Sequence, residues 1–222
     1  EPKVKTQEPK AGTTKSSYVD MNDYYYLSNG EIASFLRSKN TYLLIQDRSR
    51  ISPLELSDSI QARFGAHIGL VSKHSFGDRL VIEIKDDQQT DSILFSIYQS
   101  YPYISFISPL LQNRKKQGIL AIQPQITVRI AAGINPEEAL RLLEKEGLNL
   151  VSKLKFTDTE FQFEIAELIF DVGRIFEITR SIAELSFVEW AEPNFVTTAQ
   201  KSFTPNDPLY NQQWHLNNVG QK

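Results

Sequence analysis

The stretch LVSKLKFTDTEFQFEI, from Leu150 to Ile165, decides the fold, because it repeats the pattern of LVSKHSFGDRLVIEI at Leu70–Ile84. The letters LVSK open both stretches, 150 − 70 = 80 residues apart. In the later stretch Phe161, Phe163 and Ile165 alternate with polar residues. A period of two predicts a strand with one buried and one wet face. The repeat therefore predicts two related units, each built around such strands.

Each copy also carries a first helix with the same start and stop signals. An N-cap residue is followed by Pro and then by Glu, which is the arrangement of a capping box. The pairs are Ser52 with Glu55 and Asn135 with Glu138. Gly65 and Gly147 follow these helices, and we expect both to end them in the left-handed conformation.

The remaining elements follow in the same order in both copies. The first copy opens with a strand at 42–45 and the second with one at 126–130. Second helices are expected at 91–100 and 171–182, and closing strands at 104–107 and 185–188. The order β-α-β-β-α-β is that of the split βαβ, ferredoxin-like unit. We predict an α+β fold of two tandem ferredoxin-like units, with two antiparallel sheets, each covered on one side by two helices.

Local composition divides the chain into segments. The leader at 1–17 is rich in Lys, Glu, Pro, Thr and Ser and is expected to be flexible. The Asn29-Gly30 pair between two apolar runs predicts a β-hairpin. The expected segments are a leader at 1–17, a hairpin at 18–40, a first unit at 41–112, a linker at 113–124, a second unit at 125–196 and an extended segment at 197–222.

Composition excludes several classes of function. With 24 basic and 27 acidic residues the formal charge is −3, so nucleic acid and membrane surfaces are not expected partners. The absence of cysteine excludes disulfides and a cysteine nucleophile. The histidines, His67, His74 and His215, have no metal-site spacing and lie near no nucleophile motif. The residues by themselves therefore predict no catalytic site.

Two further stretches resemble a known family. PNDPLYNQQWHLNNVGQ, at Pro205–Gln221, resembles the opening of the catalytic domain in subtilisin-like serine proteases. FVEWAEPNF, at Phe187–Phe195, resembles the closing strand of the prodomains that precede such domains. Some bacterial members carry two ferredoxin-like prodomain units behind a tyrosine-rich hairpin. The resemblance implies a pro-region with the first residues of the mature enzyme, and a Ser-His-Asp triad that lies beyond Lys222.

The resemblance also implies roles for particular residues. It implies a prodomain that helps its own protease to fold, inhibits it and is released by autoproteolysis. The cleft-binding residues would be Thr198, Ala199, Gln200 and Lys201, the closing strand would carry Glu192, Pro193 and Asn194, and cleavage would follow Lys201 or Lys222. Asp207 would supply one ligand to a calcium ion in the catalytic domain. The implied partner is the cognate catalytic domain, and a secreted or periplasmic location is favoured.

The first copy departs from this pattern, since its closing strand ends at Ile107–Leu110 without an Ala-Glu-Pro element. The resemblance therefore assigns inhibition to the second copy and support to the first. Two other hypotheses remain open. The chain could be a tandem ferredoxin-like module that binds a ligand or regulatory partner. It could also be a free-standing subtilase inhibitor, which leaves the match after Pro205 unexplained.

Overall fold

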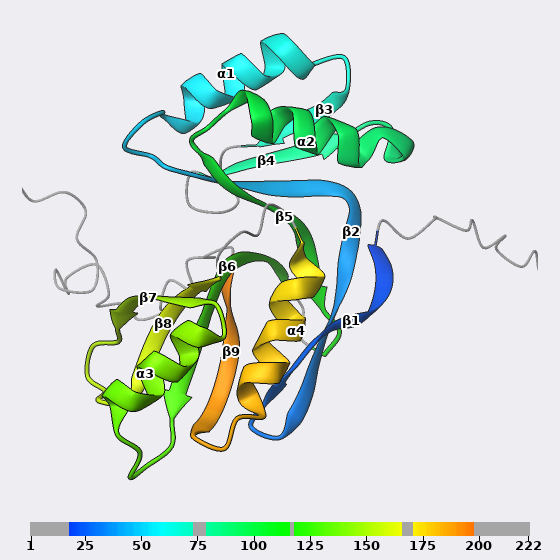
Figure 1. Ribbon diagram of the computed structural model, residues 1–222. Helices are drawn as coiled ribbons and strands as arrows, with labels where there is room; N and C mark the ends of the chain where they lie inside the picture. Colours follow the sequence, from blue (N-terminus) through cyan, green and yellow to red (C-terminus); the bar gives the residue numbers. More distant parts are fainter. Residues whose placement is uncertain (1–17, 73–78, 116–117, 166–170, 198–222) are drawn as a thin grey trace, which may run out of the picture.

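The structure is a computed structural model that describes residues 18–72, 79–115, 118–165 and 171–197 (Figure 1). The strands are β1 Tyr18–Ser28, β2 Glu31–Gln46, β3 Ile68–Ser72, β4 Leu80–Ile84, β5 Ile104–Asn113, β6 Ile119–Ile130, β7 Leu148–Lys153, β8 Glu160–Ile165 and β9 Val188–Thr197. The helices are α1 Pro53–Phe64, α2 Thr90–Ser100, α3 Pro136–Lys145 and α4 Val172–Ala183, with a short 3-10 turn, η1, at Asp87–Gln89. The α+β prediction is confirmed. The leader expected at 1–17 lies outside the described residues.

The two copies have the same strand order. In the first copy β2 and β4 are central, in the order β3-β4-β2-β5, and in the second the order is β7-β8-β6-β9. All of these pairs are antiparallel. Figure 1 shows α1 and α2 on one side of the first set of strands, and α3 and α4 on one side of the second.

The prediction of two separate sheets is wrong, because the two sets of strands form one nine-stranded sheet. The join is a hairpin between β5 and β6, in which Leu111 pairs with Leu120 and Gln112 with Ile119. The connection between the copies is therefore shorter than the linker expected at 113–124. The second half of the expected linker, from Ile119 onward, is part of β6.

The β1–β2 hairpin turns at Asn29 and Gly30, whose φ angles are 50° and 77°. Positive φ at two successive residues is what a type I′ turn requires, and Asn-Gly provides it at low cost. β2 then continues through Tyr42, so the strand expected at 42–45 is the far end of the hairpin's second strand. One strand of 16 residues thus joins the hairpin to the first copy.

The helix starts agree with the sequence more closely than the helix ends. Ser52 and Glu55 form the expected capping box, whereas the Asn135 side chain accepts from the backbone N–H of Glu137, not of Glu138. Gly147 has a φ of 85° and leaves α3 in the left-handed conformation. Gly65 does not adopt the left-handed conformation, since its φ is −57°. Its N–H continues the helical hydrogen-bond pattern by donating to the Gln61 carbonyl.

The closing strands also differ from expectation. The strand expected at 185–188 is a turn, because the backbone N–H of Leu185 donates to Ile182 and that of Val188 donates to Leu185. β9 begins only at Val188 and runs to Thr197, with Pro193 buried within it. β5 extends six residues beyond the Ile107 expected as its end, to Asn113. Both strands are long because each pairs along β2 or β6.

Two hydrophobic cores fill the two copies. The first lies between α1, α2 and their strands, and all its buried members come from the first copy. The second contains α3, α4 and the strands of the second copy, but also Tyr24 and Phe35 of the hairpin and Phe106 and Leu111 of β5. Phe35 is 1% exposed. The second core is therefore completed by residues of the hairpin and of β5, which precede the second copy in the chain.

A third, smaller cluster joins the copies. Leu43, Val81 and Leu110 of the first copy pack with Ala121 and Val196 of the second. These first-copy residues lie on the face of the sheet opposite α1 and α2, because side chains alternate along a strand and their neighbours belong to the first core. The helix-free face of the first copy is thus buried against the second copy.

Candidate interaction surface

The second copy presents a polar sheet face on which no described helix packs. On β6 and β8 the residues that alternate with the buried core are polar and half-buried or exposed. On β9 the same face carries Trp190. We call this surface the open face; its members are Gln125, Thr127, Arg129, Glu160, Gln162, Glu164, Trp190, Glu192 and Asn194.

Arg129 lies on β6, the middle strand of the open face, near one end of that face. It pairs across β8 with Glu160 and across β9 with Trp190. Its guanidinium lies 3.7 Å from the Glu160 carboxylate and 3.3 Å from that of Glu189. The Nε atom is buried and makes no hydrogen bond to the described residues. This Nε atom is the one that lies 3.3 Å from the Glu189 carboxylate, so the guanidinium is held between two carboxylates of the same sheet.

Side-chain hydrogen bonds order the rest of the open face. Gln162 Nε2 donates to Gln125 Oε1 at 2.8 Å, and Thr127 Oγ1 donates to Asn194 Oδ1 at 2.7 Å. These bonds run across the strands and hold amide groups in place. The open face is therefore a pre-ordered polar surface with one large aromatic side chain, which resembles the composition of protein interfaces.

The first copy offers no comparable surface. The corresponding face of its sheet carries Leu43, Phe106 and Ser108, each with no exposed area, and Leu110 at 7%. Ser108 Oγ accepts from the backbone N–H of Ile122 in the second copy, which fixes β6 against β5. Among the residues whose side chains the structure describes, the helix-free face of the second copy is therefore the better candidate for docking.

The closing-strand residues singled out by sequence lie together on β9. Glu192 accepts a hydrogen bond from Ser28 Oγ at 2.7 Å, and Asn194 accepts the bond from Thr127. Pro193 points the other way, is buried and pairs with Ile126. The pKa of Tyr26 is raised by burial and, secondly, by the Glu192 carboxylate. The three residues thus fix β9 in place from both sides.

The other predicted site residues lie outside the described residues. These are the cleft-binding residues Thr198, Ala199, Gln200 and Lys201, the calcium ligand Asp207 and the cleavage candidate Lys222. β9 ends at Thr197, immediately before the first of them. Their roles stay predictions.

Within the described ranges, no group of His, Asp and Glu side chains is arranged to hold a metal ion. His67 is exposed, and the other two histidines fall outside those ranges. None of the described helices has the length and hydrophobicity needed to span a bilayer.

Sequence reasoning missed two features of the site. Arg129 was not singled out, because its position between two carboxylates depends on cross-strand register. The hairpin's contact with β9 was also missed, since nothing local in the chain relates Ser28 to Glu192. The sequence did contain a signal for Arg129, because the alternation of apolar residues from Ile126 to Ile130 places Arg129 on the polar face.

No protein-family model matches this sequence, and no curated protein and no solved structure matches it either. The function is therefore inferred from the chain's own residues. The family resemblance carried by Phe187–Phe195 and Pro205–Gln221 stays a prediction.

Proposed function

We propose that this chain is the pro-region, with the first mature residues, of a subtilisin-like serine endopeptidase. In this proposal the two copies are ferredoxin-like prodomain units, and the second one docks on the catalytic domain. It guides the folding of that domain, inhibits it and is released by autoproteolysis. The triad belongs to the following domain, so this chain supplies no catalytic residue.

The strand orders support the assignment of ferredoxin-like units. In each copy the first and third strands are central, and the second and fourth lie at the edges. In each strand–helix–strand unit the two strands are not neighbours, because one antiparallel strand of the same copy lies between them. This is the split βαβ arrangement. The order by itself is compatible with many functions, so the choice among them depends on the site.

The observation that carries the proposal is the position of β9 beside the open face. β9 contains Glu192, Pro193 and Asn194, flanks the open face and includes Thr197, the described residue next in sequence to the predicted cleft-binding residues. A surface docked through the open face would therefore hold residues 198–201 close to its partner. An extended segment held in this way can add a strand to a substrate cleft, with backbone hydrogen bonds for affinity and side-chain pockets for register.

The chemistry of the open face supports docking on a protein. Trp190 supplies a large apolar area, and Arg129 supplies a guanidinium on a side chain that is 41% exposed. Aromatic and arginine side chains near the centre of an interface dominate binding energy in protein complexes. Calcium would enter only through the catalytic domain, with Asp207 as one ligand of a site whose other members lie beyond Lys222.

The test is inhibition of the subtilisin-like catalytic domain that the proposal places after this chain. Residues 1–222 and residues 1–197 are titrated against that domain, and inhibition constants are measured with a peptide substrate. The longer chain should inhibit at least tenfold more strongly, because only it can occupy the cleft. Equal inhibition by both would remove the cleft-binding role, and the absence of a triad-bearing domain from the reading frame would remove the proposal.

A second measurement addresses the open face. Replacing Trp214 by Phe leaves Trp190 as the single tryptophan, since the chain has only two. Addition of a catalytic domain with its nucleophilic serine replaced should shift the emission of Trp190 to shorter wavelength. Arg129→Ala should weaken this complex, whereas Arg174→Ala, on the exposed side of α4, should leave it unchanged. Equal effects of the two substitutions would contradict docking through the open face.

The alternative of a ligand-binding module has less support. Three shallow pockets of about 310 Å³ each lie among the described residues, lined by the hairpin, the turn after β5 and the first copy. A ligand held between the copies requires lining residues from both. Inhibition by neither chain, together with an unshifted Trp190 spectrum, would favour this alternative.

A further inference from the structure

The β1–β2 hairpin packs on the second copy through aromatic rings. Phe35 of β2 lies 5.5 Å from Phe176 of α4 and 5.1 Å from Phe195 of β9, measured between ring centroids. Tyr24 lies 5.4 Å from Phe176, and Tyr26 lies 6.0 Å from Phe195. Ring pairs at these separations add to the free energy of burial. The hairpin thus covers the α4 and β9 side of the second core.

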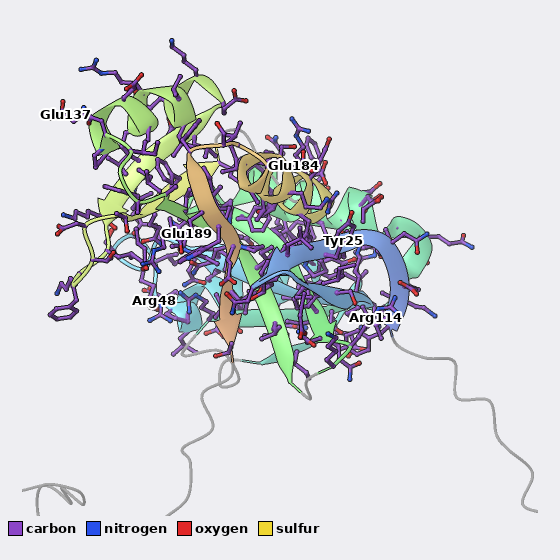
Figure 2. All side chains as sticks on the ribbon, turned by 90° about the horizontal axis from the view of Figure 1, so that it is seen from below. Tyr25, Arg48, Arg114, Glu137, Glu184 and Glu189 are labelled. Atoms are coloured by element: carbon purple, nitrogen blue, oxygen red, sulfur yellow. The ribbon has the colours of Figure 1, made fainter. Side chains whose placement is uncertain are left out.

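Polar contacts surround the aromatic cluster. Arg180 of α4 donates to the backbone carbonyls of Asp23 at 2.9 Å and Tyr25 at 3.0 Å, and its guanidinium lies 4.3 Å from the centroid of the Tyr25 ring. Ser28 donates to Glu192 at the far end of the hairpin. Figure 2 shows Tyr25 on the same side of the molecule as the end of α4, where Glu184 is labelled. The hairpin is therefore attached to both α4 and β9.

The attachment of the hairpin to α4 and β9 depends on side chains, although its second strand is also held to β5 by backbone pairing of Phe35 with Asn113 and of Arg37 with Leu111. β1 pairs with β2 only, and no backbone ladder joins the hairpin to β9 among the described strands. Side-chain contacts of this kind open more readily than a strand ladder and do so without global unfolding. Among the described strands β9 pairs only with β6, and the hairpin contacts β9 through Ser28 with Glu192 and Tyr26 with Phe195.

We infer that the β1–β2 hairpin is a strap that holds β9 in place on the second copy. Loss of these side-chain contacts would loosen β9 while leaving the first core intact, because that core contains no hairpin residue before Tyr42. The strap would then regulate inhibition by the second copy. This last step rests on the proposed function, whereas the control of β9 by the hairpin does not.

The test is hydrogen exchange of backbone amides in the full chain carrying Ser28→Ala and Arg180→Ala. The matched control carries Ser181→Ala and Arg174→Ala, which change the same residue types on α4 without touching the hairpin. We expect amides of β9 to exchange at least about tenfold faster in the strap variant, since hydrogen bonds to a charged group and a cation–π contact are lost. Amides of β4 serve as the internal reference and should change less than about twofold.

Equal exchange in the two double variants would overturn the inference. If the strap variant also loses protection in β4, its fold is lost, and Ser28→Ala alone is compared with Ser181→Ala. That single change should speed exchange at Phe195 and Val196 about threefold if the strap acts through Glu192. No difference between these single variants would again overturn it.

An inhibition assay on the same variants separates the two proposals. Faster exchange in β9 together with weaker inhibition supports both. Faster exchange in β9, without any inhibition by the parent chain, supports the strap inference and contradicts the proposed prodomain function. Unchanged exchange in β9 contradicts the strap inference, whatever the inhibition constant is.

Discussion

Ser108 shows how much a single buried hydroxyl can do where the two copies meet. Its side chain is fully buried, donates to the Pro109 carbonyl at 2.8 Å and accepts from the Ile122 N–H at 3.0 Å. β6 leaves β5 just before this point, since their last backbone pair is Leu111 with Leu120. The hydroxyl therefore replaces a ladder partner for an amide that would otherwise be buried and unbonded.

We expect Ser108→Ala to lower the free energy of unfolding by about 1–3 kcal/mol, because it leaves the Ile122 N–H buried without an acceptor. Urea denaturation followed by circular dichroism measures this loss. Ser105→Ala is the matched control, since the Ser105 hydroxyl donates to the Ile45 carbonyl from an exposed position. A loss no larger than that of the control would show that Ile122 finds another acceptor.

Glu55 is a second residue whose environment can be read by titration. The Ser52 hydroxyl and backbone N–H hold the pKa of this carboxyl below its usual value of 4.5. A depressed pKa means that the contribution to stability is present above the unfolded pKa and is lost as the pH falls through the folded pKa. In Ser52→Ala the pKa of Glu55 should rise toward 4.5, as measured by NMR titration. Asp158, whose pKa is lowered by Lys153, should keep its value.

At the scale of elements, β9 decides how short the chain can be made. It pairs with β6 from Val188 to Thr197, and Pro193 and Val196 are buried. We expect a chain ending at Thr197 to keep its thermal stability. A chain ending at Ala191 should lose its cooperative transition, because half the strand and two buried side chains are gone. Circular dichroism melting curves compare them, and equal curves would mean that the second half of β9 contributes little.

Elements with local signals were predictable from the sequence. Ser52 marks the start of α1, and the alternation at Phe161 and Phe163 gives β8. Elements whose limits are set by distant partners were not predictable. The chain around Leu185 has the apolar content of a strand but forms a turn, and β9 is long because β6 lies beside it. The open face could be anticipated as a polar face, but the pairing of Arg129 with Glu189 required the register.

At the scale of the whole molecule, the second copy is not self-sufficient. Phe35 and Tyr24 fill its core, and neither belongs to residues 119–197. We expect the fragment 119–197 to lack a cooperative unfolding transition and to bind a hydrophobic dye. The fragment 18–197 should unfold in one transition, because the copies share buried clusters. Cooperative unfolding of 119–197 would show that the hairpin is dispensable.

The contact between Ser28 and Glu192 joins residues 164 positions apart. At a synthesis rate of about 5–20 residues per second, the hairpin emerges roughly 8–33 seconds before the strand that it covers. The first copy has all its own core residues before β9 is made, so it is free to fold on the ribosome during that interval. Tyr24 and Phe35 lack Phe176 of α4 for most of that interval, and Phe35 lacks Phe195 for all of it. A newly made chain therefore presents an aromatic surface to chaperones until translation has passed Phe195, and synthesis of β9 is what allows that surface to be covered.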